Sequence, residues 1–240
     1  MEIKITKNYD EMSSVAAKMV AKQIEAKKDS RICFATGGTP LKTYQDLIAL
    51  YKENKVSFKD VVSFNLDEYV GVQETNKCSY HYYMHHNLFD HIDIQKQNIN
   101  FPNGNGDLVA NSLSYEEKIK ALGGIDFMIL GIGTNGHIAF NEPGSKVTDR
   151  TREVSLTKST IESNKIYFDS EKDVPKTAVS MGIGTILEAK KIILIANGES
   201  KAQAIYDAIK KPVSEDCPAS FLQLHKDVTF ILDEAAAKLI

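Results

Sequence analysis

The chain has 240 residues, with 29 basic and 32 acidic side chains and a formal net charge of -3. Hydrophobic residues make up 42% and charged residues 25%, a globular composition that excludes fibrous and disordered classes. The acidic balance argues against a nucleic-acid partner, and the absence of an apolar run of roughly 20 residues argues against a membrane partner. Cys33, Cys78 and Cys217 form no Cys-x-x-Cys pair, which predicts reduced thiols in a cytoplasmic protein.

Short β-branched runs alternate with longer amphipathic segments along most of the chain. The predicted strands are 31–36, 61–65, 125–130, 191–196 and 228–232. The predicted helices are 12–28, 41–53, 80–91, 113–122, 178–190 and 200–210. This alternation predicts an α/β fold, an open and mostly parallel sheet covered by helices on both faces in a Rossmann-like three-layer arrangement. No linker rich in Pro, Gly and Ser interrupts it, so we expect residues 1–240 to form a single domain.

Ligands of open parallel sheets bind beyond the carboxyl ends of the strands, so the residues after each predicted strand are informative. The first such junction reads TGGTP at 36–40. Gly37 and Gly38 permit close approach of a ligand, and the helix that follows presents free N–H groups and a positive dipole end. The motif predicts a phosphate site without the Walker lysine, with a tight turn capped by threonine as the alternative.

The second junction reads NLDEYVG at 65–71. Adjacent carboxylates in an extended segment point in opposite directions, so either Asp67 or Glu68 can face the ligand while the scaffold holds the other. A carboxylate in a partly dry crevice has a raised pKa and can act as a general base. A solvated loop is the alternative interpretation.

The third junction reads GIGTNGHIAFNEPG at 131–144. Its Gly-x-Gly-x-x-Gly pattern matches a dinucleotide-binding turn, but Pro143 leaves little room for the long helix that such a turn opens. Asn135, His137 and Glu142 lie within eight residues of one another. A histidine in a glycine-rich loop after a strand, with a carboxylate five residues on to orient it, indicates catalysis, and a structural histidine is the alternative.

Two further positions carry weaker signals. His81 and His85 have the spacing of two zinc ligands, but Tyr82 stands where the metalloprotease signature needs Glu, so a polar helix face is favoured. Lys201 follows the strand at 191–196 and opens the next helix. Its position suits an anionic ligand, and a solvated lysine is the alternative.

Several motifs together resemble the glucosamine-6-phosphate deaminase family. Besides the three junctions, the matching text is SYHYYMH at 79–85, VPK at 174–176, MGIGTIL at 181–187 and LQLH at 222–225. The similarity runs in order over residues 1–235, and the pairing of LDEY with GHIAFNEP makes it specific. The resemblance implies reversible isomerisation and deamination of glucosamine 6-phosphate with water to fructose 6-phosphate and ammonium, in catabolism of N-acetylglucosamine. It implies no cofactor and no metal.

The resemblance also implies roles for the candidate residues. It implies that Asp67 moves a proton from C2 to C1 of the opened sugar, and that His137 opens the ring while Glu142 orients its imidazole. Many members have Asp where this chain has Asn135, which can only hydrogen-bond and orient. The residues that fall where the family holds the sugar phosphate are Gly37, Gly38, Thr39 and Lys201.

Two departures from the family pattern concern phosphate binding and regulation. Ile166 stands where the family commonly has a phosphate-binding Arg, and its neighbour Lys165 lacks the bidentate fork of Arg. Regulated relatives continue beyond the equivalent of Ile240, which favours an unregulated monomer or small homo-oligomer here. Arg150 and Arg152 nevertheless lie where an effector phosphate binds in the regulated forms, so both behaviours remain open.

Three alternative functions are compatible with parts of this pattern. A 6-phosphogluconolactonase has a similar glycine-rich loop but lacks the LDEY acids and the NEP sequence after the histidine. A deaminase of galactosamine 6-phosphate differs only in the epimer. A non-catalytic sugar-phosphate sensor needs a DNA-binding module, for which this chain has neither spare length nor basic charge.

Overall fold

The computed structural model describes residues 1–164, 168 and 174–240. Its strands are β1 (Glu2–Thr6), β2 (Arg31–Phe34), β3 (Val62–Asn65), β4 (Asp67–Tyr69), β5 (Ile99–Asn100), β6 (Phe127–Leu130), β7 (Arg152–Ser155), β8 (Thr177–Ser180), β9 (Ile192–Ala196) and β10 (Val228–Asp233). Its helices are α1 (Tyr9–Ala26), α2 (Leu41–Lys52), α3 (Tyr80–Asn87), α4 (Leu108–Ala121), α5 (Lys158–Asn164), α6 (Ile183–Leu187) and α7 (Ala202–Lys210). Short 3-10 turns lie at Phe89–His91, Lys96–Asn98, Glu199–Lys201 and Pro218–Leu224.

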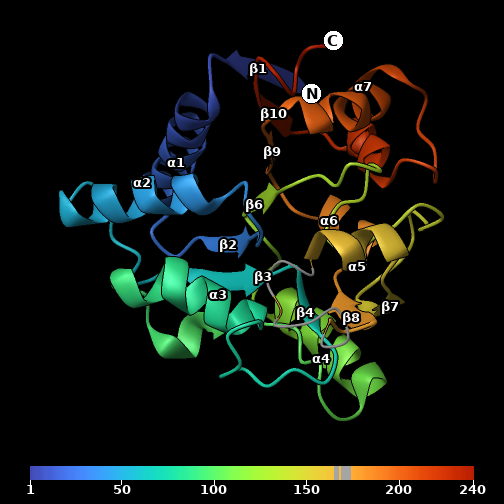
Figure 1. The fold of residues 1–240 in the computed structure, drawn as a ribbon. Helices are drawn as coiled ribbons and strands as arrows, with labels where there is room; N and C mark the ends of the chain where they lie inside the picture. The colour runs from blue at the N-terminus through green and yellow to red at the C-terminus, as the bar shows by residue number, and fades with distance from the viewer. Residues whose placement is uncertain (165–167, 169–173) are drawn as a thin grey trace.

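Seven strands form one sheet in the order β1-β10-β9-β6-β2-β3-β5, and every pairing in it is parallel. Because β1 pairs with β10, the two ends of the chain lie close together at one end of the molecule (Figure 1). The central strands are buried along their whole length, as their apolar sequences require. The predicted mostly parallel α/β fold is therefore confirmed.

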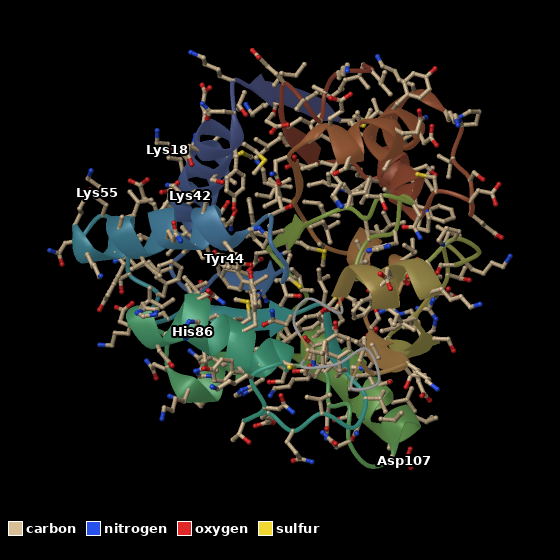
Figure 2. All side chains as sticks on the ribbon, viewed as in Figure 1. Lys18, Lys42, Tyr44, Lys55, His86 and Asp107 are labelled. Atoms are coloured by element: carbon tan, nitrogen blue, oxygen red, sulfur yellow. The ribbon has the colours of Figure 1, made fainter. Side chains whose placement is uncertain are left out.

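Helices cover both faces of this sheet. Phe34 on β2 packs edge-to-face on Tyr44 of α2, with ring centroids 6.0 Å apart. Figure 2 shows Tyr44 pointing inward between α2 and the sheet, in contrast to Lys55 at the outer end of that helix. Phe64 on β3 packs in the same geometry on Tyr115 of α4. The sheet is thus the middle layer of three.

A second, antiparallel sheet of three strands in the order β4-β8-β7 was not predicted. The predicted helix over 178–190 is wrong: its first part is β8, and only Ile183–Leu187 is helical. Residues 178–180 are buried on both sides of the strand, so they carry no one-sided helical periodicity. Pairing with β4 and β7, which come from distant parts of the chain, decides the strand.

The other differences concern two short strands and the start of one helix. The edge strand β1 and the two-residue strand β5 were not predicted. Helix α4 begins at Leu108 rather than at 113, because the side chain of Asp107 accepts hydrogen bonds from the N–H groups of Val109 and Ala110. Among the described residues, no helix combines the length and the apolar character needed to cross a membrane.

Candidate active site

Four neighbouring parallel strands, β9, β6, β2 and β3, end at one edge of the sheet. The segments that follow them line a single pocket with a cavity of about 310 Å³, within the lower range for small-molecule sites. Seven of the eight predicted site residues line this pocket; they are Gly37, Gly38, Thr39, Asp67, Asn135, His137 and Lys201. The eighth, Glu142, lies behind His137, which it contacts. The fold therefore brings the predicted residues together at the expected edge.

The adjacent carboxylates of β4 occupy different environments. Glu68 accepts hydrogen bonds from the N–H groups of Tyr80 and His81 at the start of α3, at 3.0 and 2.9 Å. Asp67 lines the pocket with 6% of its surface exposed, and no described residue donates a hydrogen bond to its carboxylate. Burial, together with the charge of Glu68, raises the pKa of Asp67 to about 8. Asp67 can therefore exchange a proton near neutral pH.

The glycine-rich loop after β6 folds His137 back over Gly133. The N–H of Gly133 donates to the carbonyl of His137 at 2.9 Å. A Cβ at position 133 would lie 2.2 Å from the imidazole Cε1, so a residue other than glycine would displace the ring. No helix lies between β6 and β7. The Gly-x-Gly-x-x-Gly pattern thus builds a turn that holds a histidine and does not open a dinucleotide-binding helix.

Asn135 lies between His137 and Glu142. Its Oδ1 is 2.7 Å from Nδ1 of His137, and its Nδ2 donates to Oε2 of Glu142 at 2.7 Å. The same Oε2 lies 3.4 Å from Nδ1 of the imidazole. Because Oδ1 can only accept, this hydrogen-bond pattern assigns the proton of a neutral imidazole to Nδ1. Nε2 is then the basic nitrogen of a pocket-lining side chain.

Glu142 is buried behind the imidazole, with 8% of its surface exposed. Desolvation opposes its ionisation, but hydrogen bonds and charge from His137, with hydrogen bonds from Thr160 and Asn135, outweigh it and lower the pKa of Glu142 to about 2. A carboxylate held in this state stabilises a positive charge on the imidazole. The three side chains therefore form an acid-base unit that can accept a proton and return it.

The turn after β2 has the features of an anion site. Gly37 has a φ of 97°, and its carbonyl accepts a hydrogen bond from the hydroxyl of Tyr83 at 2.6 Å. Thr39 donates its hydroxyl to Asn197 at 3.0 Å, which joins this turn to the loop carrying Lys201. The ammonium of Lys201 makes no hydrogen bond or ion pair with any described residue, and burial lowers the pKa of this side chain. A half-buried lysine beside the start of α2 indicates a site for a dianion.

Lys201→Met is expected to raise the KM for a phosphorylated substrate and the Kd for inorganic phosphate about tenfold to 100-fold. The reason is the loss of a charge-assisted hydrogen bond from the ammonium to the phosphate group. The two constants are measured by steady-state kinetics and by calorimetric titration with phosphate. Lys211→Met, which removes an exposed lysine paired with Asp207, is the matched control. Equal constants for wild type and Lys201→Met would remove this lysine from the anion site.

Several pocket residues had no role predicted from the sequence, and Tyr80 and Thr160 are two of them. Tyr80 lines the pocket from the first position of α3. Its ring stacks on that of Phe140, with the ring centroids 6.0 Å apart. Thr160 lines the pocket from α5. Tyr80 belongs to the SYHYYMH motif at 79–85, where the aromatic residues carried no predicted role. Thr160 lies in a segment without any motif, and no sequence signal pointed to it.

The weaker candidates lie elsewhere or pair within the chain. His81 and His85 stack on each other at 4.7 Å, and the described part of the chain contains no cluster of three metal-binding side chains. Arg152 pairs with Asp149 at 2.8 Å. Arg150 pairs with two carboxylates, those of Glu116 and Glu188. Positions Lys165 and Ile166 lie outside the described residues.

Comparison with known proteins identifies the relatives of this chain. The sequence profile of the family "Glucosamine-6-phosphate isomerases/6-phosphogluconolactonase" matches residues 6–231. The chain is 49% identical to a glucosamine-6-phosphate deaminase of Thermoanaerobacter sp. strain X514, over 100% of this chain and 95% of the relative. It is 50% identical to the same enzyme of Clostridioides difficile strain 630, over 99% of this chain and 96% of the relative.

Solved structures place the fold in the same group. A monomeric glucosamine-6-phosphate deaminase superposes with a TM-score of 0.98 at 44% identity, over the whole of both chains. A 6-phosphogluconolactonase of Trypanosoma brucei has a TM-score of 0.76 at 22% identity, over 99% of this chain and 97% of that one, which shows a shared fold alone. The profile match and the full-length relatives establish that this chain belongs to the glucosamine-6-phosphate isomerase/6-phosphogluconolactonase family.

Proposed function

We propose that this chain is an enzyme that converts glucosamine 6-phosphate and water reversibly to fructose 6-phosphate and ammonium. The proposal rests on the placement of Asp67, a buried carboxyl to which no described residue donates a hydrogen bond, in the same pocket as the His137 unit. Isomerisation of an aldose needs both a group that opens the ring and a base at C2. The full-length relatives named as glucosamine-6-phosphate deaminases support this choice of substrate.

Ring opening is assigned to His137. Nε2 takes the proton of the anomeric hydroxyl while the ring oxygen leaves C1, and the imidazolium then returns a proton to that oxygen. Asn135 keeps the imidazole oriented through its contact at Nδ1. Glu142 stabilises the charge that the imidazole gains. These steps leave an open-chain amino aldehyde whose phosphate end is held by the turn at 36–40 and by Lys201.

Isomerisation and loss of nitrogen follow from the second group. Asp67 removes the proton from C2, which gives an enediol-like intermediate, and delivers a proton to C1, while one proton of the C2 ammonium group passes to the C1 oxygen. The resulting C2 iminium adds water, and the C–N bond breaks to give the ketose and ammonium. One water is consumed and no electrons enter or leave, so the acid-base groups of the pocket suffice for the reaction. A pKa near 8 allows Asp67 both to accept the proton from C2 and to donate a proton to C1.

The purified protein is expected to release ammonium from glucosamine 6-phosphate without added nucleotide or metal. The assay couples ammonium to an indicator enzyme and is run in parallel on galactosamine 6-phosphate, which differs at C4, and on 6-phosphogluconolactone. Turnover of the lactone without ammonium release from either amino sugar would reject the deaminase proposal. Release from the galacto epimer alone would reassign the substrate.

We also propose that residues 1–240 act as a single catalytic domain, in a monomer or a small homo-oligomer in the cytoplasm. The monomeric deaminase of nearly identical fold supports the monomer. The pocket lies beside the parallel sheet of one chain, so substrate binding needs no second copy. Arg150 and Arg152 are occupied by carboxylates of the same chain, which supports unregulated activity.

A further inference from the structure

The side of Glu142 that faces away from the imidazole is held by two threonines. Its Oε2 accepts a hydrogen bond from Nδ2 of Asn135 and lies 3.4 Å from Nδ1 of His137. Its Oε1 accepts hydrogen bonds from the hydroxyl of Thr157 at 3.1 Å and from the hydroxyl of Thr160 at a shorter distance. Both oxygens of the carboxylate are therefore occupied, and each by groups that favour its ionised form.

The two threonines are themselves locked together at the first turn of α5. The N–H of Thr160 donates to Oγ1 of Thr157 at 3.3 Å, and the two hydroxyl oxygens are 3.1 Å apart. The N–H of Ile161 donates to the carbonyl of Thr157 at 2.9 Å, so Thr157 is the residue at which the helical turn begins. Thr160 is 4% exposed and also lines the pocket. Its single hydroxyl proton is committed to Glu142.

We infer that Thr160, supported by Thr157, is a positioning residue for the ring-opening reaction, an inference that rests on the function proposed above. It fixes the rotation of the Glu142 carboxylate so that Oε2 faces Nδ1 of His137. Without the hydroxyl, Oε1 is a buried anionic oxygen short of a donor, and rotation of the carboxylate toward another donor removes Oε2 from the imidazole. The chain thus orients His137 from both sides, through the loop after β6 and through α5.

Other buried threonines in the chain provide a control for the loss of a hydroxyl. Thr185 on α6 is 2% exposed and donates its hydroxyl to the carboxylate of Glu116, as Thr160 does to Glu142. Neither Thr185 nor Glu116 lines the pocket. Thr185→Val therefore removes a bond of the same chemistry with no connection to His137, and it separates a loss of stability from a loss of positioning.

The test compares Thr160→Val, Thr160→Ser and Thr185→Val with wild type in ammonium release. Thr160→Val keeps the shape of the side chain, and kcat is expected to fall about tenfold, which is the factor that one charge-assisted hydrogen bond supplies. The Kd values for inorganic phosphate and for an open-chain substrate analogue, the sugar alcohol of glucosamine 6-phosphate, are expected to stay unchanged. Thr160→Ser restores the hydroxyl and is expected to recover most of kcat, and Thr185→Val is expected to keep it.

A second readout needs no substrate. The Nδ1 proton of His137 gives a low-field 1H NMR signal whose position depends on its hydrogen bond, and we expect Thr160→Val to shift it and Thr185→Val to leave it in place. An unchanged signal and unchanged kcat in Thr160→Val would overturn the inference, as would equal losses in the Val and Ser variants. If wild type releases no ammonium, the proposed function fails while the NMR comparison still tests the positioning role.

Discussion

Asp67→Asn is expected to lower kcat for ammonium release about 10³-fold, the scale of a lost general base. The amide has nearly the shape of the carboxyl but cannot accept the C2 proton. No described residue donates a hydrogen bond to the Asp67 carboxylate, so the substitution removes no such bond from the described part of the chain. Exchange of the C2 hydrogen with D₂O, followed by NMR, reports the step directly. We expect exchange to stop while inorganic phosphate still binds with the wild-type Kd.

The same variant has an expected effect on stability that distinguishes loss of a base from misfolding. Burial raises the pKa of Asp67 from 3.8 to about 8, so the native chain keeps a proton that the unfolded chain has lost. The wild-type free energy of unfolding therefore falls on account of this group as the pH rises from about 4 to about 8. Asn has no charge to desolvate. Denaturant titrations at pH 5 and pH 8 should show a higher free energy of unfolding for Asp67→Asn than for wild type, and the difference should be larger at pH 8.

Exchange at the wild-type rate in Asp67→Asn would remove Asp67 from the base role. Glu68→Gln is the contrasting variant. Glu68 accepts two N–H groups at the start of α3, and an amide nitrogen in place of one oxygen would oppose a backbone donor. This variant is expected to lose stability, with any loss of activity following from that. These outcomes would distinguish a reacting role for Asp67 from an anchoring role for Glu68.

His137→Gln is expected to lower kcat for the closed-ring substrate about 10²-fold to 10³-fold, because Gln offers no basic nitrogen for proton transfer. The reaction begins with the cyclic sugar, in which the anomeric hydroxyl must lose a proton. A substrate analogue that is already open should bypass this requirement. Binding of the open-chain sugar-alcohol phosphate, measured as a competitive inhibition constant, is expected to change little.

The decisive comparison for His137 is between the closed-ring substrate and a pre-opened aldehyde phosphate that retains the C2 hydrogen. Equal losses of C2 exchange with both compounds would contradict a ring-opening role. Asn135→Ala provides the graded control, since it removes the contact at Nδ1 but leaves the imidazole. We expect the kcat of Asn135→Ala for the closed-ring substrate to lie between the values of wild type and His137→Gln.

The strand-end motifs were predictable because each is local. The glycines at 37, 38, 133 and 136 serve turns, and a turn is specified by the few residues within it. The rule that ligands bind at the carboxyl ends of parallel strands then joined motifs that are up to 165 residues apart, from Thr36 to Lys201. Seven of the eight predicted residues indeed line one pocket. Their roles in the reaction stay predictions until the variants are measured.

The features that were missed depend on contacts between distant segments. β8 was predicted as a helix because its partners, β4 and β7, lie far from it in sequence. Thr160 lies 18 residues beyond Glu142, after a strand of the second sheet, and only the packing of α5 brings its hydroxyl to that carboxylate. Neither relation leaves a periodicity or a motif that could be recognised in the chain.

The sequence by itself determined most of the alternation of strands and helices, the family, and most of the residues that line the pocket, because hydrophobic periodicity, turn residues and motifs are local properties of the chain. Only the tertiary structure decided which of the two adjacent acids faces the pocket. It also decided that Asp67 has a raised pKa while Glu142 has a lowered one. Both carboxylates are buried, and the difference lies in the donors that the fold supplies: none for Asp67 among the described residues, and several for Glu142.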